Sequence, residues 1–180
     1  AFTKDQYFYK YFGNTLYFVV TLVPIVLALS LLLAILINKK TSWVNNIYRV
    51  ALFLPSITST VAVSMVWLWI FNPDMGLINN FLMAIGLNDV PMWLGDTAWS
   101  KPALVIMRVW QMGGYYMIMF LAGLQTIPET LYEAAELDGA SEIQKFFRIT
   151  LPLLSNTTFV VMILLVIEAF NMFESIFIMT

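Results

Sequence analysis

The sequence predicts an all-α fold, a polytopic transmembrane helical bundle. Of the 180 residues, 61% are hydrophobic and 11% are charged, and the mean hydropathy is +0.82. A soluble domain is about 45–50% apolar and about 25% charged, so this balance is typical of a membrane protein. Four apolar stretches are long enough to cross a bilayer, which takes a helix of ~20 residues. They cover residues 14–38, 48–71, 102–124 and 151–170.

Absent residue types and motifs exclude several kinds of chemistry. The chain has no cysteine and no histidine, which excludes disulfides, thiol nucleophiles, histidine acid–base catalysis and the usual zinc sites. The eight glycines never form the G-x-x-x-x-G-K-[ST] pattern, so there is no P-loop to bind ATP. A net charge of −2 provides no basic field for nucleic acid. We expect no metal site.

The first apolar stretch follows a polar and aromatic segment. Residues 1–13 suit a short helix at the membrane–water interface, and they lack the layout of a signal peptide. The stretch 14–38 carries no charge and ends at Lys39 and Lys40, and Pro24 within it predicts a kink. Because the sequence does not begin with Met and stops within an apolar pattern, we expect a piece of a longer chain.

The second stretch, 48–71, combines a proline with small hydroxyl side chains. Hydroxyls can bond backbone groups that Pro55 frees, and small residues let helices approach closely. The cluster consists of Ser56, Thr58, Ser59 and Thr60. After a turn at Asn72-Pro73-Asp74, residues 75–88 have helical spacing but are too short to cross. They predict a helix on the membrane surface, followed by a loop over 90–101.

A polar island, residues 126–150, separates the third and fourth stretches. It contains two short helical patterns, at 127–138 and 142–149, and Gly139 between them suits the left-handed conformation that ends a helix. We therefore predict a helix–turn–helix elbow outside the bilayer. Its two start signals are the capping-box pairs Thr126/Glu129 and Ser141/Gln144.

The elbow resembles the "EAA" loop of the membrane-spanning subunits of ABC importers. That motif reads Glu-Ala-Ala, three residues, Gly, nine residues, Ile-x-Leu-Pro. This sequence matches it at Glu133, Ala134, Ala135, Gly139, Ile149, Leu151 and Pro152. The additional residues Asp138, Ala140 and Phe147 are similar to the carbohydrate-uptake branch, of the maltose and glycerol-phosphate type. Further similarity lies at 13–16, 53–55, 69–73, 76–79, 93–96, 109–111, 120–124 and 170–180.

The resemblance implies a permease subunit of an ATP-driven ABC importer in a prokaryotic cytoplasmic (inner) membrane. Such a subunit moves a sugar or oligosaccharide by alternating access and is not itself an enzyme. The implied partners are a cytoplasmic ABC ATPase dimer, which holds ATP and Mg, a second permease subunit, an extracytoplasmic solute-binding protein and membrane lipid. Neither a cofactor in this chain nor nucleic acid is implied. Family members usually have six spans, so the first and last are expected to be missing here.

The elbow would serve as the handle through which the ATPase moves the membrane helices. Glu133 would pair with a basic residue of the ATPase, and the apolar anchors would be Phe146 and Phe147. The expected coupling residues are Glu133, Ala134, Ala135, Asp138, Gly139, Ala140, Phe146, Phe147, Ile149, Leu151 and Pro152. The alternative is a plain connecting loop, and Glu129, Glu136 and Glu142 are interpreted as a solvated acidic face.

Apart from Arg49 at the start of the second stretch, two charges fall inside predicted spans, Arg108 and Glu168. At about 1.5 Å per residue both lie roughly 7–10 Å outward of the midplane, so we hypothesise that they pair beside the substrate path. Family members tend to have small or polar residues at both positions. The other expected path residues are Gln111, Asn171 and Glu174 for hydroxyl groups, and Trp110 and Tyr115 for sugar rings. Alternatively, Arg108 snorkels to headgroups, Glu168 sits at the interface and the tryptophans are interface anchors.

Orientation and two rival functions complete the sequence-based expectations. If the elbow is cytoplasmic, five cations lie inside and three outside, in weak agreement with the positive-inside rule: Lys39, Lys40, Arg49, Lys145 and Arg148 against Lys4, Lys10 and Lys101. An ion-coupled secondary transporter would want acids near the midplane and an internal repeat, and we see neither. A non-transporting membrane scaffold would not need the glycine elbow. The sequence does not name the solute.

Overall fold

The computed structural model describes residues 8–38, 43–87 and 90–179, with the backbone alone at residues 8, 43, 44, 173 and 174. Every regular element in these ranges is helical, as the sequence predicts. In chain order the elements are α1 (Phe8–Ile37), α2 (Trp43–Ile57), α3 (Thr60–Ile70), α4 (Leu77–Ala84), α5 (Ser100–Gln125), α6 (Glu129–Leu137), α7 (Glu142–Lys145), the π-helical segment η1 (Phe146–Thr150), α8 (Leu151–Leu153), α9 (Ser155–Phe170) and α10 (Phe173–Met179).

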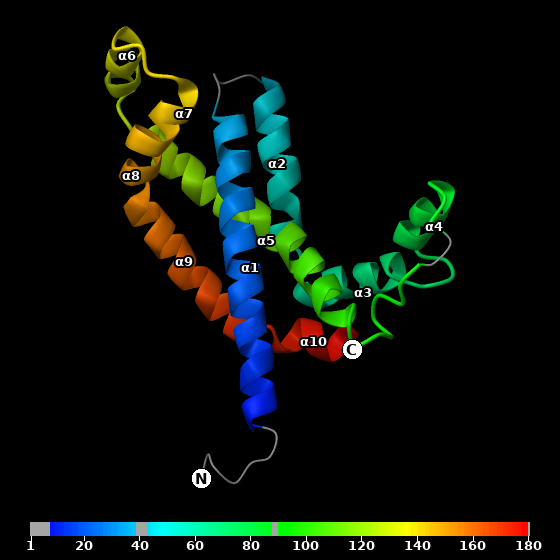
Figure 1. The fold of residues 1–180 in the computed structure, drawn as a ribbon. Helices are drawn as coiled ribbons and strands as arrows, with labels where there is room; N and C mark the ends of the chain where they lie inside the picture. Colours follow the sequence, from blue (N-terminus) through cyan, green and yellow to red (C-terminus); the bar gives the residue numbers. More distant parts are fainter. Residues whose placement is uncertain (1–7, 39–42, 88–89, 180) are drawn as a thin grey trace.

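The central helix of the bundle is α5 (Figure 1). It packs against α1, α2 and α9, and α1 also packs against α9. Met107, Met117 and Phe120 of α5 are fully buried, together with Val26 of α1 and Leu165 of α9. Burying one such side chain stabilises a fold in water by about 1.5–3 kcal/mol. Within lipid, close packing between the helices stabilises the bundle instead.

The outward faces are apolar as well. Val20, Leu32 and Leu36 of α1 are all exposed, and a helix that is apolar all round fits a bilayer. In the described residues two helices, Tyr9–Ile37 and Ser100–Gln125, are long and apolar enough to cross a membrane. The number rises to four if two bent helix pairs each count as one span. The first helix continues through Pro24 without interruption.

The predicted span 48–71 is sharply bent, and it is one span if the bent pair is counted together. The structure divides it into α2 and α3, which meet at an angle of 99°. Proline removes a backbone donor, and the hydroxyls following it compete for carbonyl groups. The hydroxyl of Ser56 donates to the Phe53 carbonyl over 2.7 Å, and that of Thr58 donates to the Leu54 carbonyl over 3.2 Å. These bonds cap the end of α2, so α3 leaves in a new direction.

The fourth predicted span, 151–170, is divided too. The segment from Glu142 to Leu153 meets α9 at an angle of 67°, and the break falls at Leu154, which is buried. The short α4 matches the predicted surface helix in type but is shorter. Its Asn79 is buried and accepts a hydrogen bond of 2.7 Å from the Trp93 indole, which ties α4 to the segment before α5.

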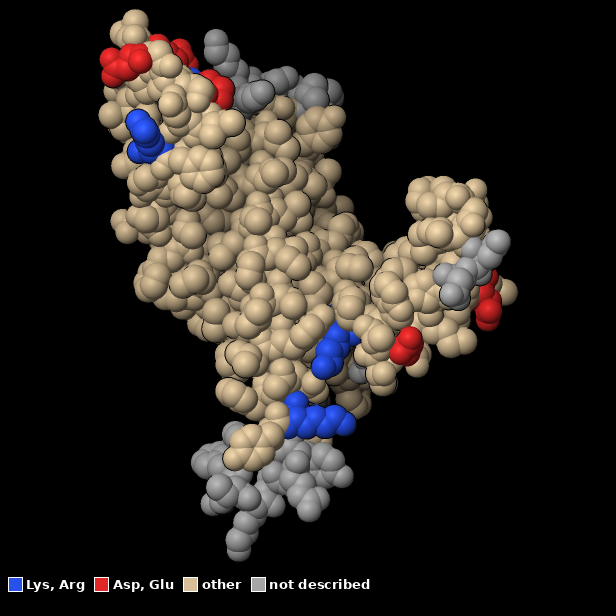
Figure 2. Space-filling view, in the orientation of Figure 1, with Lys and Arg blue, Asp and Glu red and all other residues tan. Residues whose placement is uncertain are grey.

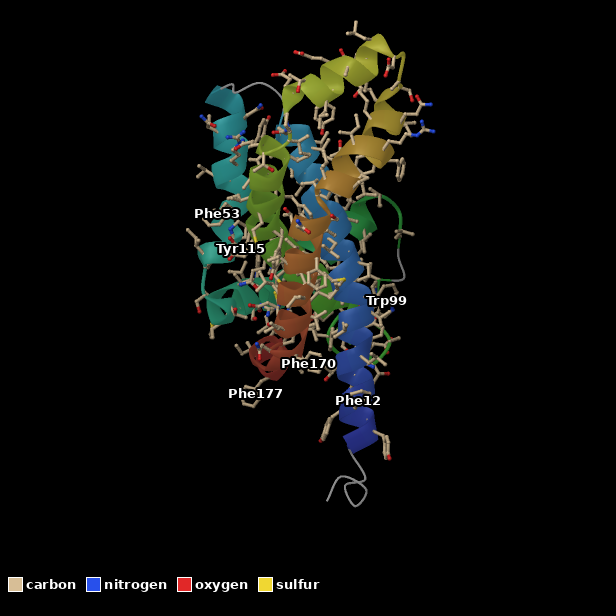
Figure 3. All side chains as sticks on the ribbon, turned by 90° about the vertical axis from the view of Figure 1, so that its left-hand side faces the viewer. Phe12, Phe53, Trp99, Tyr115, Phe170 and Phe177 are labelled. Carbon is tan, nitrogen blue, oxygen red and sulfur yellow. The ribbon has the colours of Figure 1, made fainter. Side chains whose placement is uncertain are left out.

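Charged residues gather at the two ends of the molecule. On the face in Figure 2, acidic side chains cluster at the end formed by α6 and α7, with a basic side chain just below them, and both basic and acidic side chains lie toward the opposite end. A broad band of described residues between them shows no charge on this face. Figure 3 places Phe12, Trp99, Phe170 and Phe177 toward the end opposite α6. Aromatic side chains at that level suit a membrane–water interface.

Candidate functional site

The polar elbow forms at one end of the bundle (Figure 1). Gly139 connects α6 to α7 with φ +74°, a left-handed conformation that glycine adopts without steric cost. Ser141 and Gln144 form the predicted capping box at the start of α7, with both reciprocal bonds present. The other predicted capping box is wrong, because α6 begins after Pro128 and the Thr126 hydroxyl donates to the Gly123 carbonyl. Thr126 therefore caps the end of α5.

A buried lysine braces the two helices of the elbow. The Lys145 ammonium lies 2.8 Å from a Glu136 carboxylate oxygen on α6 and also pairs with Glu142 on α7. The hydrogen bond to Glu136, followed by that to Glu142, raises the pKa of Lys145. Glu136 and Glu142 do lie on an exposed acidic face, with side chains 64% and 88% exposed, but both also pair with Lys145. The i,i+3 spacing of Glu142 and Lys145 could have indicated one of these pairs.

A second contact joins the elbow to the segment that follows it. The Tyr132 and Thr150 hydroxyls lie 2.9 Å apart, which links α6 to the end of η1. The predicted helix 142–149 does not end there but continues as η1 into α8. Single-turn π-helical segments are frequent at functional sites. With this link and the lysine brace, α6 is held at two points by the segment that follows it.

The elbow also exposes large apolar side chains. Leu137 is 90% exposed and Phe147 is 60% exposed, and Ile143 lies exposed between them in sequence. Glu133 and Ala134 are exposed on α6, whereas Ala135 is half-buried. A hollow of about 370 Å³ opens between the two helices, lined by Ala135, Asp138, Gly139, Ala140, Gln144, Lys145, Arg148 and Ile149. The predicted coupling residues thus share one end of the molecule, with Leu151 and Pro152 directly below in α8. Sequence reasoning did not identify Ile143.

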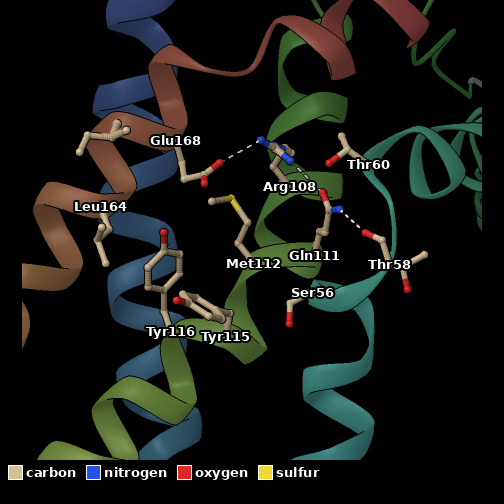
Figure 4. A pocket seen from close by; sticks show the side chains of 11 residues that line it. Ser56, Thr58, Thr60, Arg108, Gln111, Met112, Tyr115, Tyr116, Leu164 and Glu168 are labelled. Atoms are coloured by element: carbon tan, nitrogen blue, oxygen red, sulfur yellow. Dashed lines mark hydrogen bonds and ion pairs between the residues drawn. The ribbon is translucent and has the colours of Figure 1, made fainter.

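A polar cavity of about 320 Å³ lies between α2, α5 and α9 (Figure 4). A chain of three contacts crosses it. Arg108 Nη2 lies 3.6 Å from Glu168 Oε2, and Arg108 Nη1 donates to Gln111 Oε1 over 2.9 Å. Gln111 Nε2 then donates to the Thr58 carbonyl over 3.4 Å. The break between α2 and α3 frees the Thr58 carbonyl from helical hydrogen bonding. The bend therefore supplies the acceptor that holds Gln111 in the cavity, and Gln111 in turn satisfies the carbonyl at the bend.

The cavity contains part of the predicted substrate path. Arg108, Gln111, Tyr115 and Glu168 line it, and the hypothesised Arg108–Glu168 pair forms. Trp110 is not among the lining residues and packs instead on Trp67, with ring centroids 5.7 Å apart. The lining residues that the sequence prediction did not include are Ser56, Thr58, Thr60, Met112, Tyr116, Leu164 and Ile167. The hydroxyl cluster near Pro55 could have indicated some of these lining residues, but a role in helix packing explained the cluster equally well.

The remaining predicted path residues lie elsewhere or outside the described part. Asn171 caps the end of α9 and does not line the cavity. The side chain of Glu174 lies outside the described residues, although its backbone belongs to α10. Lys4, Lys39 and Lys40, used for the orientation estimate, also fall outside the described residues. The end of α1 lies on the elbow side, because Ile35 and Asn38 share a hollow with Tyr132 and Phe146.

Comparison with known proteins places this architecture among transport proteins. Residues 26–178 match the family described as "Binding-protein-dependent transport system inner membrane component". The chain is 35% identical to the probable ABC transporter permease protein YurN of Bacillus subtilis over 178 residues, which cover 98% of this chain and 61% of YurN. It is 34% identical to the lactose transport system permease protein LacF of Rhizobium radiobacter, covering 97% and 58%. It is 39% identical to the arabinooligosaccharides transport system permease protein AraP of Halalkalibacterium halodurans, covering 95% and 54%.

Solved structures agree with these relatives. The fold is similar to that in the crystal structure of a bacterial ABC transporter involved in the import of the acidic polysaccharide alginate. The TM-score is 0.87 at 28% identity, over 98% of this chain and 62% of the other. A similar chain, with a TM-score of 0.88 and 28% identity over 99% and 62%, comes from the alginate ABC transporter in complex with an alginate pentasaccharide-bound periplasmic protein. The chain thus spans less than two thirds of the length of each protein compared here.

Proposed function

Because the chain belongs to the family of binding-protein-dependent transport system inner membrane components, we propose that it is a permease subunit of an ATP-driven importer in a prokaryotic inner membrane. Its cargo would be a sugar or oligosaccharide, moved by alternating access. The relatives are transport permeases and not enzymes. Two of their names specify lactose and arabinooligosaccharides, and they support the sugar class for this chain.

The observation that carries the proposal is the braced elbow with its exposed apolar side chains. A motor protein can only drive a membrane helix through a part that does not yield under load. Here α6 is braced by Lys145 and linked to η1 through Tyr132 and Thr150. Exposed Leu137 and Phe147 supply apolar anchors for the partner surface. The turn at Gly139 sets the angle at which α6 is presented.

The proposed partners follow from this coupling role of the elbow. A cytoplasmic ABC ATPase dimer would bind the elbow and hold ATP and Mg, so this chain would need no cofactor of its own. The exposed Glu133 would pair with a basic residue of that ATPase. A second permease subunit and lipid would cover the apolar faces of the bundle. An extracytoplasmic binding protein would deliver cargo; the similar alginate transporter was solved in complex with a periplasmic protein that carries an alginate pentasaccharide.

The polar cavity is the proposed path of the cargo through this subunit. The hydroxyls of Ser56, Thr58 and Thr60 and the amide of Gln111 can exchange hydrogen bonds with sugar hydroxyls, and Tyr115 offers a ring face. We keep three further residues in the proposed path only for another conformation of the alternating-access cycle: Trp110, Asn171 and Glu174. An ion-coupled secondary transporter or a membrane scaffold remains the alternative. The family match favours the importer over both.

The turn at Gly139 provides the test. In the full-length protein assembled with its ATPase, Gly139→Pro should abolish ATP-dependent uptake, because proline fixes φ near −65°. Gly139→Asn should retain most uptake, since asparagine tolerates positive φ, and a Cβ at this position meets no atom within 4 Å in the described structure. The amount of each variant in the membrane fraction controls for insertion. Uptake that is unchanged in Gly139→Pro would contradict coupling through the elbow.

A further inference from the structure

The polar cavity contains a fixed charge and its counter-charge. Of the described residues that line it, Arg108 and Glu168 are the charged ones, and the others are hydroxyl, amide, aromatic or apolar. Their side chains differ sharply in exposure, with Arg108 at 7% and Glu168 at 45%. The cation is therefore held inside the protein, while part of the carboxylate faces the open cavity (Figure 4).

The guanidinium of Arg108 is directed at protein groups on two sides. Nη2 faces the Glu168 carboxylate on α9, and Nη1 donates to Gln111 on its own helix. Gln111 is itself fixed by the Thr58 carbonyl. Arginine would be a natural ligand for a cargo carboxylate, because its fork matches that group. In this cavity that position is already taken by Glu168.

A charge buried inside a membrane protein needs a partner, and removing one partner is costly. An anionic cargo entering the cavity would approach the exposed Glu168 oxygens before it reached Arg108. Two like charges close together repel and raise the free energy of the complex. An uncharged cargo meets no such barrier, and its hydroxyl groups can donate to the exposed carboxylate of Glu168.

We propose that Glu168 sets the charge selectivity of the cavity. By occupying Arg108, it makes the cavity accept uncharged, hydroxyl-rich solutes and reject anionic ones such as uronates. Without the Glu168 charge, Arg108 becomes an anion-binding group. This inference rests on the proposed function in one respect, namely that the cavity is the path of the cargo. The relatives and neighbours include transporters for both kinds of cargo, lactose and the acidic polysaccharide alginate, so their names leave the choice open.

Galactose and galacturonate give a matched pair of probes, since they differ only in a hydroxymethyl group against a carboxylate. Binding of each is measured by saturation-transfer NMR on the full-length transporter complex in nanodiscs. The affinity for galacturonate should rise at least about tenfold in Glu168→Gln, a factor that corresponds to about 1.4 kcal/mol. The affinity for galactose should change far less. The double variant Arg108→Gln/Glu168→Gln should lose the gain.

The controls separate charge from structure. Glu168→Asp keeps the negative charge and should show no gain, and Glu129→Gln removes an exposed acid on the distant elbow and should behave as wild type. If Glu168→Gln does not fold, Glu168→Ala is tested by thermal unfolding with and without acetate. Acetate should raise its Tm by filling the vacated place beside Arg108. It should not do so in Arg108→Gln/Glu168→Ala.

Three results would overturn the inference. They are no gain in galacturonate affinity in Glu168→Gln, a gain that persists in the double variant, or, if acetate is the readout, no rise in Tm. None of these readouts depends on ATP. If the wild-type complex showed no ATP-dependent uptake of any sugar, that result would instead count against the proposed function.

Discussion

At Gly114 the backbones of α5 and α2 come close together. A Cβ built at this position of α5 would overlap the carbonyl oxygen and carbon of Leu52 on α2. Small residues at helix interfaces allow such backbone approach in membrane proteins. At the neighbouring Gly113 the nearest atom is the flexible end of the Leu29 side chain, at 3.4 Å. The two adjacent glycines therefore face very different constraints.

Gly114→Ala should destabilise the bundle, because α5 and α2 must move apart to admit the methyl group. We expect the free energy of unfolding to fall by about 1–3 kcal/mol, as in other overpacked cores. Gly113→Ala is the matched control and should cost much less, since a leucine side chain can shift. Denaturant unfolding in detergent, followed by circular dichroism, compares the two variants. Equal stabilities of the two variants would contradict the close approach of α2.

The helix α6 depends on contacts made outside its own sequence. It has nine residues, none of them buried, and no side-chain cap at its start. Isolated helices of this length are marginal in water. Lys145, Glu136 and the Tyr132–Thr150 contact hold it in place. The helix is therefore stabilised from the C-terminal side of the elbow.

Lys145→Met should loosen α6 by removing both ion pairs of the brace. Hydrogen exchange followed by mass spectrometry should show faster deuterium uptake over residues 129–137, whereas Glu129→Gln, an exposed control, should leave it unchanged. Because the pKa of Lys145 is raised above its ordinary value of 10.5, the brace should persist across neutral pH. On the alkaline side, the brace should be lost as the pH rises through that raised pKa. Exchange in α6 that is the same in Lys145→Met as in wild type would show that the brace contributes nothing.

At the scale of the whole molecule, α5 joins two ends of different chemistry. It begins at Ser100, next to Lys101, whose ammonium lies 5.2 Å from the ring centroid of Tyr17, and it ends at the elbow. Its 26 residues give a length of about 39 Å at ~1.5 Å per residue, enough to cross the ~30 Å hydrocarbon core. The elbow and the loop before α5 should therefore face opposite sides of the membrane.

Single cysteines can map this orientation, because these 180 residues contain no cysteine of their own. Thr97→Cys lies on the exposed loop before α5, and Glu129→Cys lies on the elbow. A membrane-impermeant maleimide added to spheroplasts should label the first variant, and the second only after permeabilisation. Any cysteine elsewhere in the full-length chain is first replaced by serine. Equal labelling of both variants before permeabilisation would contradict a cytoplasmic elbow.

The sequence by itself determined the helical class, the apolar stretches, the turn at Gly139 and the capping box at Ser141. Each of these depends on local rules: hydropathy over ~20 residues, the φ that glycine allows, and hydrogen bonds between residues three apart. The family resemblance added the expected coupling role of the elbow residues, because that motif has a fixed spacing. The false capping box at Thr126 shows the limit of local rules. The Thr126 hydroxyl had two possible backbone partners, and in the structure it donates to the Gly123 carbonyl at the end of α5.

The sequence predicted the Arg108–Glu168 pair from the heights of the two residues in their spans, but only the tertiary structure decided the other polar contacts between elements. The bend between α2 and α3 needs an α5 side chain, Gln111, to donate to the freed Thr58 carbonyl. The brace at Lys145 needs Glu136, nine residues away across the glycine turn. Trp110 packs on Trp67 and does not line the cavity. These choices depend on where three or more helices come together, and distances between helices are set by packing that no single stretch of sequence encodes.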